Sequence, residues 1–493
     1  MYTREEARAL VDKVIALGKD AKADTVEVNL TGGERSGTRW ANSSITTNLV
    51  QYDRQITATV RIGQKQANAN TRDFSDAGLK KMIDEAIDEA NKANDNPNLP
   101  ELLGAQEYIP IDGALPSLIA YGPAERARMV KDSIDTAERM GVLGAGYIPK
   151  NDITTCNANS KGLFAYYRSA EMGFSLTCRM ADGTGSGWSG TTGVKDVSTV
   201  DAKALTTVAA NKALKSRKAK AIEPGRYTVI MEPRANARFL SLLLGIFNPN
   251  GGGFGPPGAG GPDGPPGAGG DTPPAAGGGA AGAFGGGGGG RGGGGGGGGG
   301  LFNNAPGSAA SYMTGKKVGD KLFSELFTLK SDIGNSTLRQ NTILNDNKPA
   351  KPVTWVEKGV LRAFGPNQGA NTNQSLVMEG SDLSIEDMIK QTRRGLLITQ
   401  FWYIRGVPSQ EQALLNTGMT RDGLFLIENG EIVGPVQNFR WNMSPLVGYN
   451  NLTLVGKPVP METGEAFGAG GNAALIPPVR IEEFYMTSVS PAV

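Results

Sequence analysis

The stretch YTVIMEPRANARFLSLLLGI, residues 227–246, predicts a strand that runs into an apolar helix. The residues Tyr227–Met231 form an apolar run typical of a buried strand. The helix is expected from about Asn236 to Ile246, and it is apolar on nearly every side, as in a helix enclosed by a core. We place a domain boundary just before this strand, near Glu223–Gly225, which gives domains over residues 1–224 and 225–493.

The first of these domains is predicted to combine long helices with a curved antiparallel sheet. Thr3 and Glu6 form a capping box, and the helix that they open ends near Gly18. Further helices are expected over residues 79–90, 124–140 and 202–215, with strand-like runs over 142–188. Strands that come in batches between helices are typical of the α+β class. Two stretches of alternating apolar residues predict a meander: Val26, Val28, Leu30 and Ile56, Ala58, Val60, Ile62.

The second domain is predicted to be rich in strands, with short helices at 321–329 and 383–390. A Gly/Pro-rich segment interrupts it at residues 249–306, and residues 251–300 hold 30 of the 71 glycines of the chain. Glycine at every third position over 252–272 leaves two interpretations: a flexible surface loop, or polyproline-II-like strands that serve as an intersubunit contact. Strands are expected at Leu396–Ile404, Leu424–Ile427, Ile432–Val436, Leu452–Val455 and Val479–Met486.

The composition excludes several kinds of site. The chain has no histidine and 2 cysteines, so it cannot form a structural zinc site of four Cys or His ligands within one subunit. Two cysteines fit a reducing cytoplasm, with a Cys156–Cys178 bridge as the less favoured alternative. A formal charge of +2 predicts neither a nucleic-acid partner nor an anionic membrane surface. The charged N-terminus is unlike a secretory signal, and no apolar run is long enough to span a bilayer.

Local motifs that suggest chemistry each have a simpler structural interpretation. Residues 185–190, GSGWSG, match a dinucleotide-binding pattern, but no helix opening follows, so a Gly-rich strand or turn is expected. Ser160 and Lys161 are expected in a turn, and ENGE at 428–431 predicts a hairpin with exposed acids. The aromatic run in TQFWYIR, residues 399–405, suggests either a surface for an extended peptide or a buried strand, and we favour the strand.

Several stretches together resemble the TldD/PmbA family of modulator-of-gyrase-type metallopeptidases, over nearly the whole chain except the Gly-rich segment. The stretches are NSKGLFAYYRS (159–169), DGTGSGW (182–188), YTVIMEP (227–233), the pair Thr372 and Asn373, MEGSDLSIEDMIKQTRRGLLIT (378–399) and TGMTRDGLFLIENGEIVGPVQNFRWN (417–442). The resemblance implies a two-domain α+β fold of this family.

In the peptidase branch of that family, the helix after the YTVIMEP strand carries HExxxH, and a cysteine near the C-terminus completes the metal site. This sequence has neither at the matching places, and no cysteine follows residue 178. We therefore expect no catalytic residue and no metal ligand in this chain, because aliphatic side chains cannot donate a lone pair. The matching positions are Ser241, Leu242, Leu243, Leu244, Gly245 and Ile246.

The resemblance to the PmbA/TldE branch implies a non-catalytic subunit of a cytoplasmic metallopeptidase that acts on unfolded or extended peptides. Zinc is then expected only in a TldD-like, histidine-containing partner. Candidate substrate-facing residues are Thr372, Asn373, Trp402 and Tyr403. Two alternatives are a self-associating structural protein that uses the Gly-rich segment as an intersubunit contact, and an autonomous hydrolase with a site that lacks histidine.

Overall fold

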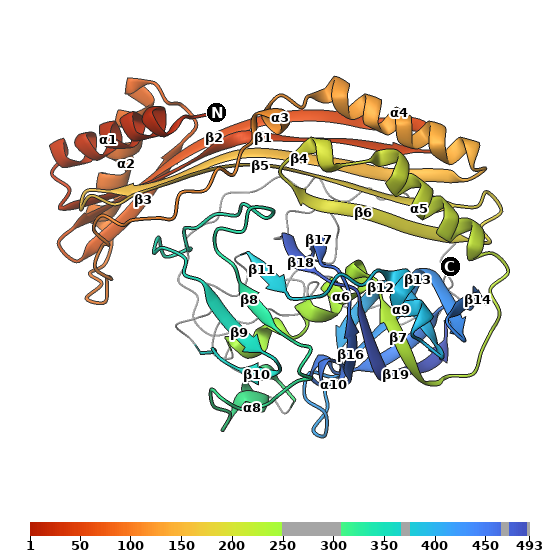
Figure 1. Ribbon diagram of the computed structural model, residues 1–493. Helices are drawn as coiled ribbons and strands as arrows, with labels where there is room; N and C mark the ends of the chain where they lie inside the picture. The colour runs from red at the N-terminus through yellow and green to blue at the C-terminus, as the bar shows by residue number, and fades with distance from the viewer. Residues whose placement is uncertain (249–306, 366–374, 465–472, 491–493) are drawn as a thin grey trace, which may run out of the picture.

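A computed structural model describes residues 1–248, 307–365, 375–464 and 473–490 of the chain. Its first feature is a long antiparallel sheet in the spatial order β3-β2-β1-β4-β5-β6 (Figure 1). This confirms the predicted meander, although the strands run further than the alternating apolar residues alone indicated. The strands are β1 (Thr25–Ala41), β2 (Ser44–Ile62), β3 (Lys65–Thr71), β4 (Leu143–Asn159), β5 (Phe164–Arg179) and β6 (Ser186–Val194).

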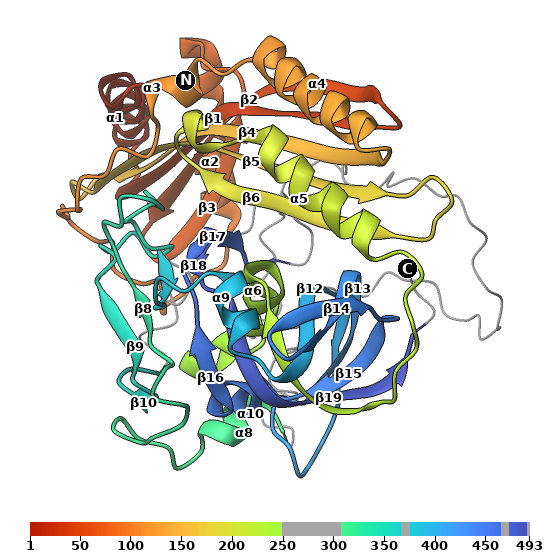
Figure 2. The same cartoon turned by 45° about the vertical axis from the view of Figure 1, so that its right-hand side comes forward.

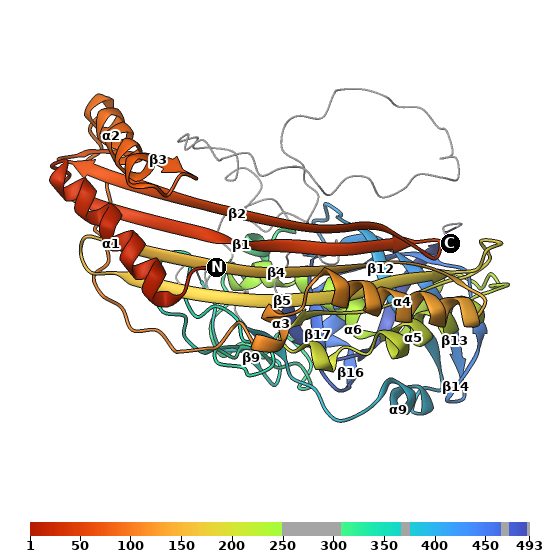
Figure 3. The same ribbon diagram turned by 90° about the horizontal axis from the view of Figure 1, so that it is seen from above.

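Long helices cover the outer face of this sheet, as Figure 3 shows from above. The Thr3–Glu6 capping box opens the first helix, and the predicted helices at 79–90, 124–140 and 202–215 are also present. Two apolar cores lie between helices and sheet, one under α1 and α2 and one under α4 and α5. The elements are α1 (Arg4–Asp20), α2 (Asp76–Lys92), α3 (Pro116–Ile119), α4 (Pro123–Arg139), the 3-10 turn η1 (Val197–Thr199) and α5 (Ala202–Lys215).

The GSGWSG stretch lies in and just before β6, as the strand interpretation predicted. A Cβ atom on Gly187 would lie 2.4 Å from the Ala209 carbonyl oxygen, and one on Gly185 would lie 2.2 Å from the Ala213 carbonyl oxygen. Both glycines therefore let α5 lie directly on the strand. Trp188, next along the strand, is buried in the core of the C-terminal part instead.

The C-terminal part lies against the other face of the long sheet (Figure 2) and contains two sheets. In the larger one, the order is β12-β7-β19-β15-β13-β14, and an additional β12–β13 pairing closes five strands into a ring. The strands are β7 (Gly225–Met231), β12 (Arg394–Gly406), β13 (Asn416–Glu428), β14 (Glu431–Pro435), β15 (Phe439–Met443), β19 (Val479–Val489) and β16 (Leu452–Val455), which pairs with β19.

The smaller sheet has the order β10-β9-β8-β11-β18-β17. Its strands are β8 (Leu329–Ser331), β9 (Val353–Glu357), β10 (Val360–Leu361), β11 (Leu376–Met378), β17 (Val459–Glu462) and β18 (Ala473–Ile476). The helices of this part are α6 (Pro233–Ser241), α8 (Ala309–Met313), α9 (Ile385–Lys390), α10 (Pro445–Asn450) and the 3-10 turn η2 (Leu244–Phe247). The five strands expected in this half and the helix near 383–390 are confirmed.

One predicted helix is shifted in the structure, and another is absent. The helix expected over 236–246 starts earlier, at Pro233, because proline is well suited to the first turn. It ends at Ser241, and the 3-10 turn η2 follows it. The helix expected over 321–329 is absent. There, Phe323 and Phe327 turn into the core, where their ring centroids lie 4.8 Å apart and Phe327 packs on Tyr449. Burial of these rings overrides the helical spacing.

The remaining sequence-based expectations have mixed outcomes. Cys156 and Cys178 are free and buried, so the less favoured disulfide is not formed, and burial raises the pKa of both thiols to about 12. No helix in the described ranges is long and apolar enough to cross a membrane. The Gly/Pro-rich segment at 249–306 lies outside the described residues. The domain boundary near Glu223–Gly225 stays a prediction.

Candidate functional site

Residues 241–246, which the resemblance aligns with HExxxH, are packed against the core of the C-terminal part. Leu243, Leu244 and Ile246 are buried among apolar side chains, and Ser241 donates its hydroxyl proton to the Arg238 carbonyl oxygen at 2.7 Å. The side chains of Leu243, Leu244 and Ile246 carry no ligand atom, so the segment offers a metal ion at most the Ser241 hydroxyl among its side chains. Among the residues that the structure describes, no group of three or more Cys, Asp or Glu side chains could hold one elsewhere.

Aromatic packing holds this segment in place. Phe239, on the last turn of α6, lies 5.4 Å from the ring of Tyr449 and 5.8 Å from that of Phe484. The polar Asn236 on the same helix accepts a hydrogen bond from the Tyr449 hydroxyl and donates one to the Pro477 carbonyl oxygen. Ring stacking and satisfied polar groups therefore fix the position of α6 on both sides.

The structure describes two of the four candidate substrate-facing residues. Thr372 and Asn373 lie outside the described residues. Trp402 and Tyr403 on β12 are 38% and 48% exposed, whereas their neighbours Phe401 and Ile404 are buried, so the favoured buried strand is correct for only half of this run. Each exposed ring stacks on a guanidinium: Arg421 lies 4.8 Å from the ring centre of Trp402, and Arg405 lies 4.5 Å from that of Tyr403.

A local irregularity of the strand exposes both rings together. The pairing of β12 with β13 shifts register between Trp402 and Arg405, and Tyr403 has a φ of 54°. A non-glycine residue in this left-handed region is uncommon and costs free energy. The bulge thus turns two successive aromatic side chains toward solvent, where a regular strand would bury one of them.

A polar joint between the N-terminal sheet and the start of α6 is the feature that the sequence did not reveal. It consists of Lys212, Glu232 and Asp422. The Lys212 ammonium on α5 lies 2.6 Å from the Glu232 carboxylate, just before α6, and also donates to the Trp188 carbonyl oxygen. Burial raises the pKa of the Glu232 carboxyl, while the Lys212 charge opposes that shift. The pair connects α5 and β6 to the start of α6, the helix that precedes the segment 241–246.

Asp422 contributes a buried carboxyl to the same joint. It lies at a bulge of β13 with a φ of 56°, and its backbone carbonyl accepts from the Thr399 hydroxyl at 3.0 Å. Its Oδ1 atom and Gln400 Oε1 are buried without a hydrogen-bond partner among the described residues. Burial raises the pKa of Asp422, and the Arg421 charge opposes the shift. An ionised carboxylate is therefore disfavoured at this position.

Asp422→Asn should make the protein more stable at neutral pH by about 1 kcal/mol, because burial disfavours the ionised carboxylate and the variant has no charge to bury. The folded-state pKa is raised, so the stability of the natural protein falls as pH rises from the ordinary value of 3.8 through the folded-state pKa. The advantage of the variant should therefore shrink toward pH 4. Urea unfolding at both pH values measures it, with exposed Asp95→Asn as the control. An equal advantage at both pH values would contradict the assignment.

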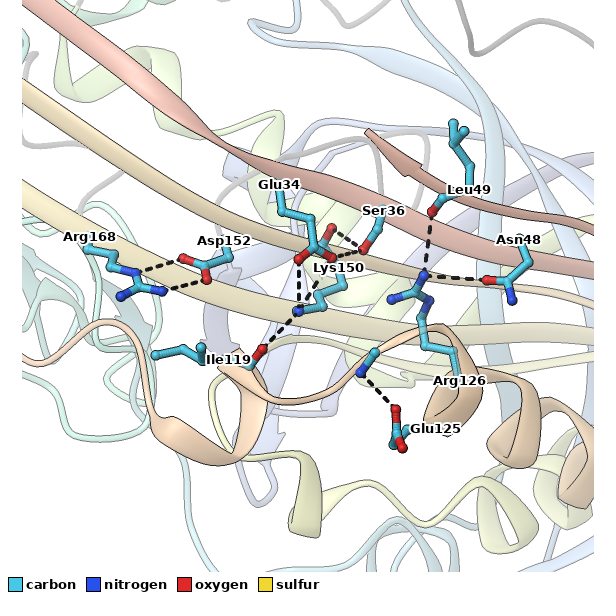
Figure 4. A network of polar contacts seen from close by, with 11 residues as sticks. Glu34, Ser36, Asn48, Leu49, Ile119, Glu125, Arg126, Lys150, Asp152 and Arg168 are labelled. Carbon is cyan, nitrogen blue, oxygen red and sulfur yellow. Dashed lines mark hydrogen bonds and ion pairs between the residues drawn. The ribbon is translucent and has the colours of Figure 1, made fainter. Parts of the chain in front are cut away.

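A second polar network lies beneath α3 and α4 on the outer face of the long sheet (Figure 4). The Lys150 ammonium lies 3.4 Å from both carboxylate oxygens of Glu34, which also accepts from the Ser36 hydroxyl at 2.7 Å. Arg126 on α4 donates to the Thr38 hydroxyl at 3.1 Å, and burial lowers the pKa of its guanidinium. These contacts join strands and helices, and nothing in them resembles a nucleophile next to a base.

The sequence contains a signal for this second network. The alternation Val26, Val28, Leu30 places even-numbered residues of β1 on the buried face, and Glu34 lies on that face. No comparable signal marks the polar joint, because Lys212 and Asp422 come from different elements that only the fold brings together. Of the chemical motifs considered, Ser160 lies in a turn, where its hydroxyl accepts from the Val26 amide, and Glu428 and Glu431 flank a hairpin turn.

Comparison with known proteins supports the assignment of the fold and of the C-terminal part. Residues 307–488 match the family model of the PmbA/TldA metallopeptidase C-terminal domain. No curated protein matches the sequence significantly. Among solved structures, TldE from Thermococcus kodakarensis is similar at a TM-score of 0.72 and 15% identity, over 97% of this chain and 100% of that one.

Two further structures have the same fold. A proposed modulator of DNA gyrase from Thermotoga maritima is similar at a TM-score of 0.72 and 15% identity, over 97% of this chain and 99% of that chain. A proposed gyrase modulator from Bacteroides thetaiotaomicron gives a TM-score of 0.70 and 15% identity, over 98% and 99%. The predicted α+β architecture, with helices on the N-terminal sheet and a strand-rich C-terminal part, is confirmed. The C-terminal part thus resembles the PmbA/TldA metallopeptidase C-terminal domain over residues 307–488, and the chain shares the fold of the TldE structure over 97% of its length.

Proposed function

We propose that this chain is a non-catalytic, TldE-like subunit of a metallopeptidase. The observation that carries the proposal is the aliphatic packing of residues 241–246, at the place where the peptidase branch carries its metal motif. Leu243 and Ile246 are fully buried there, and their side chains offer a cation no ligand atom. The similarity to a TldE structure over nearly the whole of both chains supports the same branch.

In this proposal a TldD-like partner supplies the zinc ion and the general base, and this chain helps to hold an unfolded or extended peptide. Trp402 and Tyr403 are the described candidates for contact with the peptide, since exposed aromatic rings, held in place by stacked arginines, provide apolar contact area. The chain itself binds, orients or encloses substrate and performs no proton transfer.

Co-expression with a TldD-like relative that has an intact HExxxH helix tests the proposal. We expect the two proteins to purify together and to cleave an unfolded peptide only when zinc is present, whereas this chain alone should bind much less than one zinc ion per chain and cleave nothing. Metal content measured by mass spectrometry and product measured by chromatography give both readouts. Stoichiometric zinc on the isolated chain, or no association with the relative, would reject the proposal.

A variant pair separates substrate contact from assembly. Trp402→Ala with Tyr403→Ala should raise the KM for peptide cleavage by the complex while leaving co-purification unchanged. Tyr485→Ala, an exposed aromatic residue on β19 of the same sheet, is the matched control and should leave the KM unchanged. An unaltered KM in the double variant would remove these two residues from the substrate surface.

A further inference from the structure

A pocket lies on the inner face of the long sheet, the face turned toward the C-terminal part in Figure 1. Odd-numbered residues of β1 point to this face, because the even-numbered Val26 and Leu30 are buried under the helices. Gly33 has no side chain there, and a pocket with a volume of about 280 Å³ opens beside it between Thr31 and Arg35. We call it the Gly33 pocket.

The fold keeps this position free of a side chain. Gly33 lies opposite Ile153 of β4, and a Cβ atom on Gly33 would lie 2.2 Å from the Asp152 carbonyl oxygen and 2.8 Å from the Ile153 Cα. A larger residue would therefore push the two strands apart. Glycine inside a strand often marks a place where a ligand approaches the backbone closely.

The Gly33 pocket offers one free cation. Arg35 is exposed, and its guanidinium has no hydrogen-bond or ion-pair partner within the described ranges. The pocket also contains Asp53, opposite Gly33 on β2, but this carboxylate already accepts from the Arg72 guanidinium at 3.4 Å and from the Arg54 amide at 2.9 Å. The charge left to attract a ligand is therefore positive.

The other groups of the pocket suit a carboxylate. Gln55, opposite Thr31, adds an amide without a hydrogen-bond partner in the described part of the chain, and Ile153 adds an apolar wall. A planar guanidinium binds a carboxylate through two parallel hydrogen bonds. The nearby Asp53 charge repels a phosphate dianion more strongly than a carboxylate with its single charge. A carboxylate attached to a small apolar group therefore fits best.

A chain of side chains connects the pocket to the C-terminal part. The Thr31 hydroxyl donates to the Asn29 side-chain oxygen at 3.4 Å, and the Asn29 amide donates to Asn157 on β4 at 2.5 Å. The Asn157 amide in turn donates to the side-chain oxygen of Asn347, in the C-terminal part, at 2.7 Å. A ligand that extends from the pocket along this row reaches the place where the two parts meet.

We propose that the Gly33 pocket binds a carboxylate of an extended peptide, with the Arg35 guanidinium as its cation and the Gln55 amide as a second donor. The carboxylate is that of the C-terminus or of an acidic side chain, which present the same chemistry. The volume of the pocket is just below the roughly 300–1,000 Å³ of pockets for whole small ligands, so it suits one end or one side chain of a peptide. This inference rests on the proposed role in peptide binding and names the group that is recognised.

The test measures peptide binding to the full chain alone, by isothermal titration calorimetry without zinc or a partner. The probe is an unstructured peptide of neutral residues, and its C-terminal amide should bind about tenfold more weakly than its free acid. A third peptide, amidated and with one internal glutamate, identifies the source of the carboxylate. Affinity like that of the free acid assigns the pocket to any peptide carboxylate, and affinity like that of the amide assigns it to the C-terminus.

Variants connect the effect to the pocket. Arg35→Gln should weaken binding of the free acid by about tenfold and leave binding of the amide unchanged, because only the free acid pairs with the guanidinium. Arg128→Gln is the matched control, since this arginine is 73% exposed on α4, on the other side of the sheet, and it should change neither affinity.

Three results would overturn the proposal: no binding of the free acid or equal binding of all three peptides, an Arg35→Gln variant that binds the free acid normally, or displacement of the peptide by inorganic phosphate at lower concentrations than by acetate. Each would remove the carboxylate site and leave the proposed function standing, because co-purification with a TldD-like relative and zinc-dependent cleavage are measured separately. Failure of those two experiments, in turn, would not alter the affinities measured on the isolated chain.

Discussion

Replacing Lys150 by methionine should lower the free energy of unfolding by about 3–5 kcal/mol, because it leaves the buried Glu34 carboxylate without its cation. The side chains of the pair are only 1% and 11% exposed. Lys150 also donates to the Ile119 carbonyl oxygen, so the substitution removes a link between β4 and the end of α3 as well. Methionine has a similar length, which keeps the loss of packing small. Urea unfolding followed by circular dichroism measures the change.

Two further variants isolate the charge effect. Glu34→Gln together with Lys150→Met removes both charges, so it should cost clearly less than Lys150→Met alone. Lys80→Met breaks an exposed ion pair with Asp84 on α2 and should change the stability by about 0.5 kcal/mol or less. If Lys150→Met costs no more than Lys80→Met, the buried pair does not stabilise the sheet.

The second large effect is expected where α5 lies on β6. Gly187→Ala should destabilise the protein by about 1–3 kcal/mol, because the new methyl carbon would lie 2.4 Å from both the Ala209 carbonyl oxygen and the Lys212 Cβ. The helix must then move away from the strand, and Lys212 moves with it, which strains the ion pair with Glu232.

The matched control for this prediction is Gly144→Ala on β4. Gly144 is also a buried strand glycine, but its nearest neighbour would be the Ala137 Cβ at an ordinary 3.6 Å. This variant should be neutral or more stable by about 0.4–1 kcal/mol, through the lower entropy of the unfolded chain. Equal thermal and urea stabilities for the two variants would show that close packing does not require Gly187.

The sequence predicted the elements that local patterns define. The Thr3–Glu6 capping box, the alternation at Val26, Val28 and Leu30 and the apolar run Tyr227–Met231 each determine a structure within a few residues, and each is confirmed. The prediction from sequence failed where contacts between residues far apart in the chain determine the structure. Phe323 and Phe327 have helical spacing, yet burial against Tyr449 draws them into an irregular segment.

The candidate site likewise combines features that local sequence patterns predict with features that only the fold determines. The sequence shows directly that Leu243, Leu244 and Ile246 are aliphatic. Their enclosure by the rings around Phe239 is a property of the fold. The exposure of Trp402 and Tyr403 depends on a bulge, and no local rule places a bulge there. The polar joint joins Lys212 with Glu232 and Asp422 across three elements, so residue type alone could not predict it.

The place of β7 in the chain has a consequence for biosynthesis. β7 ends at Met231, but its neighbours in the sheet are β12 and β19, and β19 runs from Val479 to Val489. During translation, β7 and the apolar α6 therefore leave the ribosome long before the strands that cover them. Until then this nascent segment exposes apolar surface that chaperones recognise, and a message truncated before the codon for Val479 would yield a polypeptide that cannot complete this sheet.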